Sequence, residues 1–208
     1  MKNKIILDLC GGTGSWSKPY KDAGYDVRLI TLPDNDVRTY VPPANVYGIL
    51  SAPPCTKFSK AGWQVKKQDR DFREGMECVR ACLEIIWKIQ ENGVPLAFWA
   101  LENPHGYLSK FLGKPAFSFQ HWQFGETNAT ATKRTAIWGY FNEPKKKTKN
   151  ERTVPLVYST VRTRALAKIP TLFGHGGRNQ NPEWSKSSVE ERAKTCAGFA
   201  QAFYKANL

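Results

Sequence analysis

Short apolar segments alternate with helical patterns along the first 140 residues of this 208-residue chain. The apolar segments that predict strands are residues 5–9, 27–32, 46–51, 95–101, 117–124 and 135–141. Their short length, and the glycine and proline residues that end several of them, are typical of strands buried in a sheet. Strands that alternate with helices favour an α/β fold in which a mostly parallel sheet has helices on both faces. In such a fold, ligands bind at the carboxyl ends of the strands.

Helical periodicity marks three segments, which are residues 17–23, 70–92 and 188–206. The second is the longest, and its apolar residues recur at steps of three and four. These residues are Phe72, Met76, Val79, Leu83 and Ile86. Gly93 follows at a position where helices commonly end. We therefore expect an amphipathic helix that covers one face of the sheet.

The pattern changes after residue 141. Residues 142–187 are basic and rich in proline, glycine, asparagine and threonine, with little periodicity. We expect one domain overall, formed by residues 1–141 and 188–208, from which residues 142–187 extend as a small loop-rich excursion. The length of the chain is also that of a single domain.

Positive charge is concentrated in this excursion. The chain has 31 lysine and arginine residues against 18 acidic residues, a net charge of +13, and residues 145–178 contain nine basic residues and one acid, Glu151. Such an excess points to a polyanionic partner, and nucleic acid is the usual one. A solvated basic surface without a partner is the alternative that charge alone leaves open.

Apolar runs and cysteines bear on where the protein works. No run approaches the roughly 20 residues that span a bilayer, and no signal-peptide pattern is found, so we expect a cytoplasmic protein. Five cysteines without regular spacing predict reduced thiols. Cys78 and Cys82, four residues apart in the long helix, are expected to pack in the core. Because the histidines are scattered, we expect no metal site.

A glycine-rich turn follows the first predicted strand. Its sequence is Asp8-Leu9-Cys10-Gly11-Gly12-Thr13-Gly14. Glycines at this point let the backbone turn tightly and approach a ligand closely. The spacing Gly-x-Gly-x-x-Gly is not met, which argues against a dinucleotide and is compatible with a smaller cofactor that contains adenosine. A tight turn without a ligand is the alternative.

Cys55 stands at the carboxyl end of another predicted strand, directly after Pro53 and Pro54. The two prolines stiffen the backbone, which a structural cysteine seldom needs, so the spacing indicates a nucleophile. Lys57, or the N-terminus of a local helix, is expected to favour the thiolate, which is the reactive form of cysteine. A structural cysteine is the alternative that the spacing leaves open.

Glu102 and Asn103, followed by Pro104, end a further predicted strand. A carboxyl group at the end of an apolar strand has a raised pKa, so it can keep its proton and donate a hydrogen bond. The alternative is that this acid only caps a helix over residues 106–112.

The order of these motifs resembles that of the cytosine C5 DNA methyltransferase family, and most closely its small single-domain phage and prophage members. The matching pieces are Asp-Leu-x-Gly-Gly-x-Gly at residues 8–14, Pro-Pro-Cys-x-x-Phe-Ser at 53–59 and Glu-Asn-Pro at 102–104. Residues 132–135 resemble the family's basic motif, and residues 195–200 resemble the C-terminal helix of its small members. The resemblance covers residues 4–141 and about 190–207.

The resemblance implies a Rossmann-like methyltransferase that uses S-adenosylmethionine and acts on DNA. Cys55 is implied as the nucleophile that adds to C6 of a flipped cytosine, so that C5 can attack the methyl group of the donor. Glu102 is implied to hydrogen-bond the base, and Asn103 to position the loop. Arg134 completes the implied catalytic set, with Arg134 or Lys133 approaching O2 of the base or a phosphate.

Two larger sets of residues are implied to bind the cofactor and the substrate. The cofactor set is Asp8, Cys10, Gly11, Gly12, Thr13, Gly14, Trp16, Asp36, Val37 and Pro53. The substrate set is Pro54, Lys57, Phe58, Ser59, Lys133, Lys145, Lys146, Lys147, Arg162 and Arg164. We expect DNA as the partner, no membrane contact and a monomer.

The chain departs from the family at several positions. Cys10 stands where an aromatic residue is common. Residues 31–33 contain no acid to hold the ribose hydroxyls, and Asp34 is the nearest candidate to replace it. Ala136 takes the place of the second arginine of the basic motif. The region left for target recognition, residues 142–187, is small, which predicts short or relaxed target specificity.

Two other functions are also compatible with the sequence. One is the same chemistry on RNA, or with a different one-carbon group transferred to cytosine. The other is a catalytically silent nucleic-acid-binding protein that has kept the fold.

The tryptophans divide into two groups. Trp99, Trp122 and Trp138 lie in predicted strands, so we expect them in the core. Trp63, just after the Cys55 segment, is a candidate for substrate contact, and Trp16 is a candidate to line the cofactor site.

Overall fold

The computed structural model describes residues 4–60, 66–93, 95–127, 130–147 and 188–208. One six-stranded sheet forms its centre, with the strand order β2-β1-β3-β4-β6-β5. The strands are β1 (Ile5–Leu9), β2 (Asp26–Ile30), β3 (Val46–Ser51), β4 (Phe98–Pro104), β5 (Phe117–Gln120) and β6 (Arg134–Tyr140). Strands β2, β1, β3 and β4 run parallel to one another, whereas β6 runs antiparallel to both β4 and β5.

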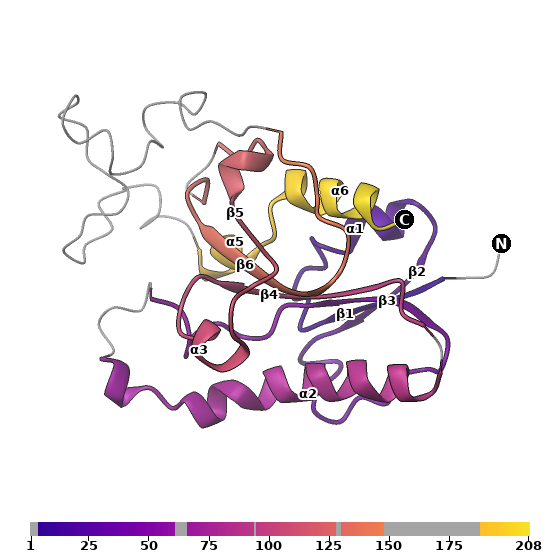
Figure 1. Ribbon diagram of the computed structural model, residues 1–208, viewed down its shortest axis with the longest axis horizontal. Helices are drawn as coiled ribbons and strands as arrows, with labels where there is room; N and C mark the ends of the chain where they lie inside the picture. The colour runs from indigo at the N-terminus through magenta and orange to yellow at the C-terminus, as the bar shows by residue number, and fades with distance from the viewer. Residues whose placement is uncertain (1–3, 61–65, 94, 128–129, 148–187) are drawn as a thin grey trace.

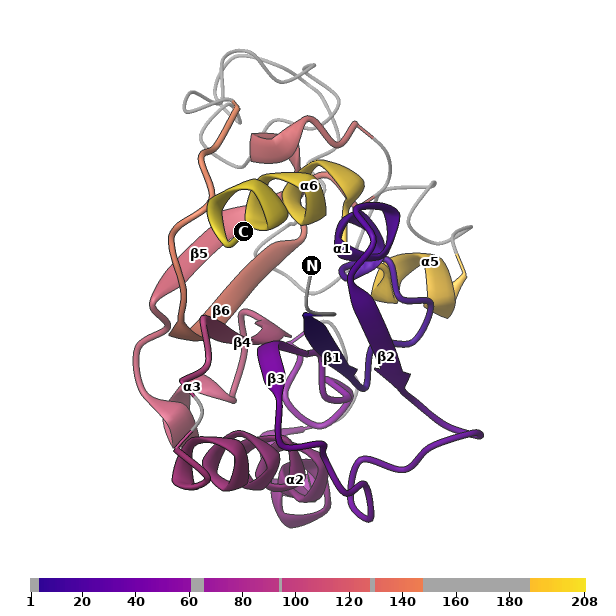
Figure 2. The ribbon, with the colours of Figure 1, turned by 90° about the vertical axis from the view of Figure 1, so that its right-hand side faces the viewer.

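Helices lie on both faces of this sheet (Figure 1). They are α1 (Lys18–Asp22), α2 (Phe72–Glu91), α3 (Ser109–Leu112), α5 (Val189–Ala193) and α6 (Ala197–Ala206), with 3-10 turns η1 (Lys67–Asp69) and η2 (His121–Phe124). The long α2 covers one face, and α1 and α6 lie together on the other, as the view turned by 90° also shows (Figure 2). The Rossmann-like, mostly parallel α/β arrangement expected from the sequence is confirmed.

Burial on both faces explains why the central strands are almost continuously apolar. Side chains alternate along a strand, so Ile5, Leu7 and Leu9 pack on the α2 side while Ile6 packs on the α1 and α6 side. All five residues of β1 are buried. Parallel strands covered on both faces read as apolar runs rather than as alternating patterns.

Three predicted elements differ from the expectation. The strand predicted over residues 95–101 is β4, Phe98–Pro104, and the other two end differently. The strand predicted over residues 117–124 stops at Gln120, because Gln120 and Gln123 form a reciprocal capping box that begins η2. Trp122 is therefore in a 3-10 turn, although it is buried as expected. The single helix predicted over residues 188–206 is broken between α5 and α6, since Lys194 and Cys196 adopt extended backbone angles.

Asn207, near the C-terminus, is hydrogen-bonded to Asn142 in the segment that follows β6. Its side chain accepts a hydrogen bond from Asn142 N (2.7 Å) and donates one to Asn142 O (3.0 Å). The hydroxyl of Tyr20 in α1 donates to the Asn207 carbonyl. These bonds place α6 between α1 and the segment that leaves β6. Across the described ranges, none of the helices has the length and apolar content to cross a membrane.

Candidate active site

Three predicted motifs meet at one edge of the sheet. Strands β1, β3 and β4 are neighbours and run parallel, with Leu9 opposite Ser51 and Ser51 opposite Leu101. Their carboxyl ends therefore lie side by side, and the segments that follow them start from the same edge. The glycine turn, the Cys55 loop and Glu102 are brought together in this way.

A buried hydrogen bond connects two of these segments. The side-chain amide of Asn103, in β4, donates to the carbonyl of Pro53 at 3.0 Å. Asn103 has no exposed surface, and Pro53 is also buried. The bond fixes the start of the Cys55 loop to the strand that carries Glu102.

The backbone of the glycine turn adopts left-handed angles, which allow a ligand to come close to the main chain. Cys10 has a φ of 57°, in the left-handed region, and its amide donates to Ile30 O at 2.8 Å. Gly12 has a φ of 55°, and nothing lies within 4 Å of the place a Cβ would take. At Gly11, a Cβ would stand 2.3 Å from Oδ1 of Asp8, so only glycine fits beside this carboxylate.

Asp8 is the buried acid of this turn. The hydroxyl of Ser17 donates to its Oδ2, and among the described residues Oδ1 has no hydrogen-bond partner. Burial raises the pKa of Asp8 to about 6, although the Ser17 bond acts in the opposite direction. Buried acceptors of this kind are commonly satisfied by ordered water or by a bound group. The turn therefore fits a ligand that brings a donor group, as the amino group of S-adenosylmethionine would.

The Cys10 side chain faces helix α2. Its thiol interacts with the thiols of Cys82 and Cys78, and the Cys82 contact, the larger effect, lowers the pKa of Cys10. Cys82 is fully buried and Cys78 half-buried, in keeping with the helix packing expected for them. The described residues contain no group of three or more His, Cys, Asp or Glu side chains able to hold a metal ion.

Trp16, a candidate to line the cofactor site, is buried in the core. Its ring is 2% exposed and packs against Phe199 and Phe203 of α6, at centroid distances of 5.8 and 5.3 Å. The physical reason is the position of α6, whose aromatic face covers the start of α1. Thr13 is exposed, and its hydroxyl lies 2.8 Å from that of Ser15.

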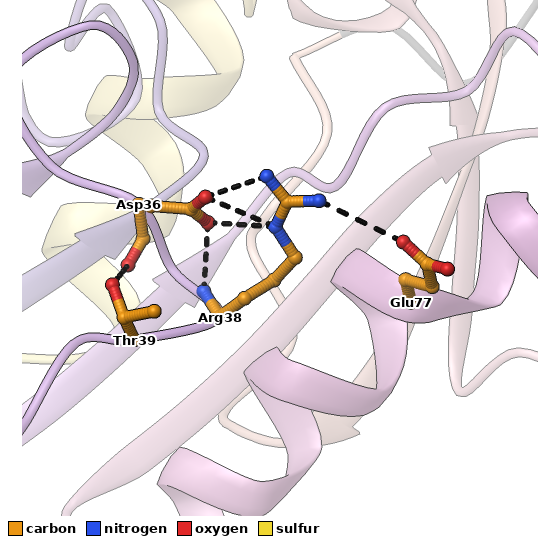
Figure 3. A network of polar contacts seen from close by, with 4 residues as sticks. All are labelled: Asp36, Arg38, Thr39 and Glu77. Atoms are coloured by element: carbon orange, nitrogen blue, oxygen red, sulfur yellow. Dashed lines mark hydrogen bonds and ion pairs between the residues drawn. The ribbon is translucent and has the colours of Figure 1, made fainter.

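Asp36, expected to contact adenine, is held by Arg38 (Figure 3). Arg38 Nη2 lies 2.6 Å from Asp36 Oδ2, and Arg38 Nε and N each lie 2.9 Å from Oδ1. The guanidinium lowers the pKa of Asp36 to about 2. Arg38 also reaches Glu77 of α2 at 3.7 Å. Asp36 would therefore accept a hydrogen bond from an adenine amine only by sharing its oxygens with Arg38. Val37, also predicted to bind the cofactor, is buried in the core.

Cys55 is half-buried in a tight turn, with Phe58 N and Ser59 N donating to its carbonyl at 3.0 and 2.8 Å. Burial raises the pKa of its thiol; the negative charge of Glu102 adds to this effect, and the positive charge of Lys133 opposes it. Lys57 was expected to favour the thiolate, and that prediction is wrong. Its ammonium pairs with Glu74 of α2 at 2.6 Å.

Glu102 behaves as the sequence predicted. It is 9% exposed, and burial raises the pKa of its carboxyl. Lys133 Nζ lies 3.9 Å from Glu102 Oε1, and both side chains are nearly enclosed. Cys55, Glu102 and Lys133 thus form one electrostatic cluster, which we call the Cys55 cluster.

Arg70 is a residue that the motifs did not single out. It is 8% exposed, and its Nη1 donates to the carbonyls of Lys57 (3.0 Å) and Ser59 (2.9 Å). Its guanidinium also lies 5.3 Å from the ring centre of Tyr107. Phe58, predicted to contact substrate, is fully buried and packs with Phe72. Arg70 and Phe58 therefore hold the Cys55 loop against the body of the protein.

The predicted basic contacts are distributed over the surface. Arg134, Lys145 and Lys147 are exposed, as is Pro54. Lys146 donates to Ser118 O at 3.0 Å and lies over the Phe117 ring, so much of its side chain is committed to β5. The predicted residues Arg162, Arg164 and Trp63, and all of residues 148–187, lie outside the described part of the chain.

No protein-family model matches the chain, and the search of curated proteins gives no match. Among solved structures, the chain is similar to the methyltransferase EhMeth of Entamoeba histolytica, with 12% sequence identity and a TM-score of 0.43. The match covers 72% of this chain and 56% of that chain. The present chain therefore spans little more than half the length of that protein. Similarity at this level gives no information on reaction or substrate.

Removing the Asp8 charge should stabilise the protein. Because the folded-state pKa, about 6, is above the ordinary value of 3.8, stability is lost as pH rises from about 4 to about 6. At pH 7.5, Asp8→Asn should raise the free energy of unfolding by about 3 kcal/mol, with little difference near pH 4. Urea unfolding measures this, with the exposed Asp34→Asn as control. A gain that is the same at both pH values would contradict the assignment.

Removing the Arg70 guanidinium should loosen the Cys55 loop. Arg70→Met leaves loop carbonyls without their donor, so the amides of Phe58 and Ser59 should exchange with solvent at least about tenfold faster, about 1.4 kcal/mol of local stability. Hydrogen exchange read by mass spectrometry measures this. The exposed Arg73, on α2, provides the control variant Arg73→Met. Equal exchange in Arg70→Met and the wild type would show that Arg70 does not hold the loop.

Proposed function

We propose that the protein is a DNA cytosine C5 methyltransferase that uses S-adenosylmethionine and forms a covalent bond between Cys55 and the base. The observation that carries the proposal is the Cys55 cluster, in which the charge of the buried Glu102 acts on the Cys55 thiol and Lys133 lies 3.9 Å from Glu102, at the edge of the sheet beside the glycine turn. The hydrogen bond from Asn103 to Pro53 holds the Cys55 loop next to the strand that carries Glu102.

The thiol addresses the difficulty of the reaction. Cytosine C5 is a poor nucleophile, because attack from this carbon interrupts the aromatic ring. Addition of the Cys55 thiolate to C6 forms a C–S bond and moves electron density to C5. S-adenosylmethionine supplies a methyl group bonded to a sulfonium, which C5 can attack. Loss of the C5 proton to a base such as water then expels the Cys55 thiolate and restores the aromatic ring.

Glu102 suits the role of the group that binds the base. Burial raises its pKa, so its carboxyl can hold a proton and donate it in a hydrogen bond to N3 as negative charge develops on the ring. Its other oxygen can accept from the exocyclic amine of cytosine. Both bonds select cytosine and strengthen as the adduct forms.

A base inside a duplex cannot reach a half-buried thiol. The target cytosine must therefore leave the stack, at a cost of a few kcal/mol. The net charge of +13 supports nucleic acid as the substrate, since basic side chains neutralise the phosphates of the opened strand. We place the protein in the cytoplasm of a bacterial or phage-infected cell, where such DNA is found.

The same reaction with a different one-carbon donor is a second candidate. Two observations favour it. Residues 31–33 offer no carboxylate for the ribose hydroxyls. In addition, Arg38 already occupies the carboxylate of Asp36 (Figure 3). The donor site thus departs from the family's pattern at the positions expected to contact ribose and adenine.

Nucleoside masses from cells test both candidates. Expression in cells that lack cytosine methylation should produce 5-methyldeoxycytidine in their DNA, and Cys55→Ala should abolish it. Cys78→Ala, a change at a cysteine of α2 outside the Cys55 cluster, should keep the product. A Cys55-dependent deoxycytidine of another added mass would support the altered donor. Unmodified deoxycytidine with the wild-type protein would contradict both candidates, and RNA from the same cells would then be analysed.

A further inference from the structure

Three basic residues could place a positive charge beside the Cys55 thiol and the Glu102 carboxyl. Lys57 is nearest in sequence, but its ammonium is paired with Glu74 at 2.6 Å. Arg134 begins β6 with an exposed side chain, and its charge acts on His105. Lys133 has 11% of its side chain exposed and lies 3.9 Å from Glu102.

The alternation of side chains along the strands separates Lys133 from Arg134. In β4 and β6, Ala100 and Ile137 pack on the α6 side of the sheet, whereas Leu101 and Ala136 pack on the α2 side. Glu102, two residues after Ala100, points to the α6 side. The same period places Arg134, the first residue of β6, on the opposite side. Lys133, just before the strand, reaches Glu102 at 3.9 Å.

The local backbone holds Lys133 in this position. Its amide donates to Thr130 O at 2.8 Å, which closes a turn just before β6. The next residue, Arg134, accepts from His105 N at 3.0 Å, where β6 meets the segment after β4. These two hydrogen bonds hold the backbone that carries the Lys133 ammonium next to β4, the strand of Glu102.

We propose that Lys133 is the positioning residue of the Cys55 cluster, whose ammonium serves as the shared counter-charge for the Cys55 thiolate and the Glu102 carboxylate. The charged groups that act on the Cys55 thiol are Glu102 from β4, which disfavours its ionisation, and Lys133 from the turn before β6, which favours it. One cation faces two acids, so the cluster accommodates one negative charge, on either Cys55 or Glu102. Ionisation of the two acids is therefore coupled.

This coupling has a consequence for the reaction, which rests on the proposed function. When the Cys55 S–H bond breaks and Glu102 gains an O–H bond, the net charge of the cluster does not change. The cluster then holds a thiolate ready to add to C6 and a neutral carboxyl ready to donate to N3. The positive charge of Lys133 favours the thiolate of Cys55, whereas burial favours the protonated carboxyl of Glu102.

Alkylation of Cys55 tests the proposal without DNA or donor. The rate of carbamidomethylation by iodoacetamide, followed on the Cys55 peptide by mass spectrometry from pH 6 to 10, reports the thiolate fraction. In Lys133→Gln, the midpoint should rise by about one pH unit, and alkylation at pH 7.5 should slow about tenfold. Lys133→Arg should restore most of the rate, and Glu102→Gln should lower the midpoint.

Two comparison variants decide the outcome. Lys57→Gln and Arg134→Gln should leave the midpoint of Cys55 alkylation near that of the wild type. A midpoint unchanged in Lys133→Gln, or one that moves as far in either comparison variant, would overturn the proposal. If Lys133→Gln fails to fold, Lys133→Met, which keeps the length of the side chain and removes its charge, is measured in its place and should show the same rise of the midpoint. A loss of methyl transfer in every assay would remove the proposed function and leave the alkylation result standing.

Discussion

The hydrogen bond from Asn103 to the Pro53 carbonyl is the contact on which the site depends. It joins the strand that carries Glu102 to the loop that carries Cys55, and both of its partners are buried. Without it, a carbonyl and an amide would remain unsatisfied inside the protein, at a cost of about 1–3 kcal/mol each. The distance between the thiol and the carboxyl would also no longer be fixed by the sheet, and the two groups could not share a counter-charge.

Two buried carboxyls of the site lower the stability of the folded protein. Asp8 and Glu102 are buried carboxyls with raised pKa values, and among the described residues Asp8 Oδ1 lacks a hydrogen-bond partner. Burying charge of this kind lowers stability unless a partner compensates it. Lys133, with 11% of its side chain exposed, compensates part of it at Glu102, and the Ser17 hydroxyl compensates part of it at Asp8. Departures from the rules of stable packing are expected where a protein binds or reacts.

Much of this was predictable because the signals are local. The apolar runs over residues 5–9, 46–51 and 95–101 marked strands that end at the site edge, and the raised pKa of Glu102 followed from its place on an apolar strand. What the sequence could not predict depends on contacts between distant segments. Glu74 withdraws Lys57 from Cys55, Arg38 engages Asp36, α6 covers Trp16, and Arg70 braces the loop from outside every motif. Spacing along the chain carries no information on such pairings.

The central claim is a covalent bond between Cys55 and a cytosine. A duplex that contains 5-fluorodeoxycytidine tests it directly, because fluorine at C5 cannot leave as a proton does and the adduct cannot resolve. Incubation with this DNA and S-adenosylmethionine should give a complex that survives denaturation. Peptide mass spectrometry should place the nucleotide on Cys55, and Cys55→Ser should form none. A complex attached to another cysteine, or no covalent complex although the protein binds the duplex, would contradict the account.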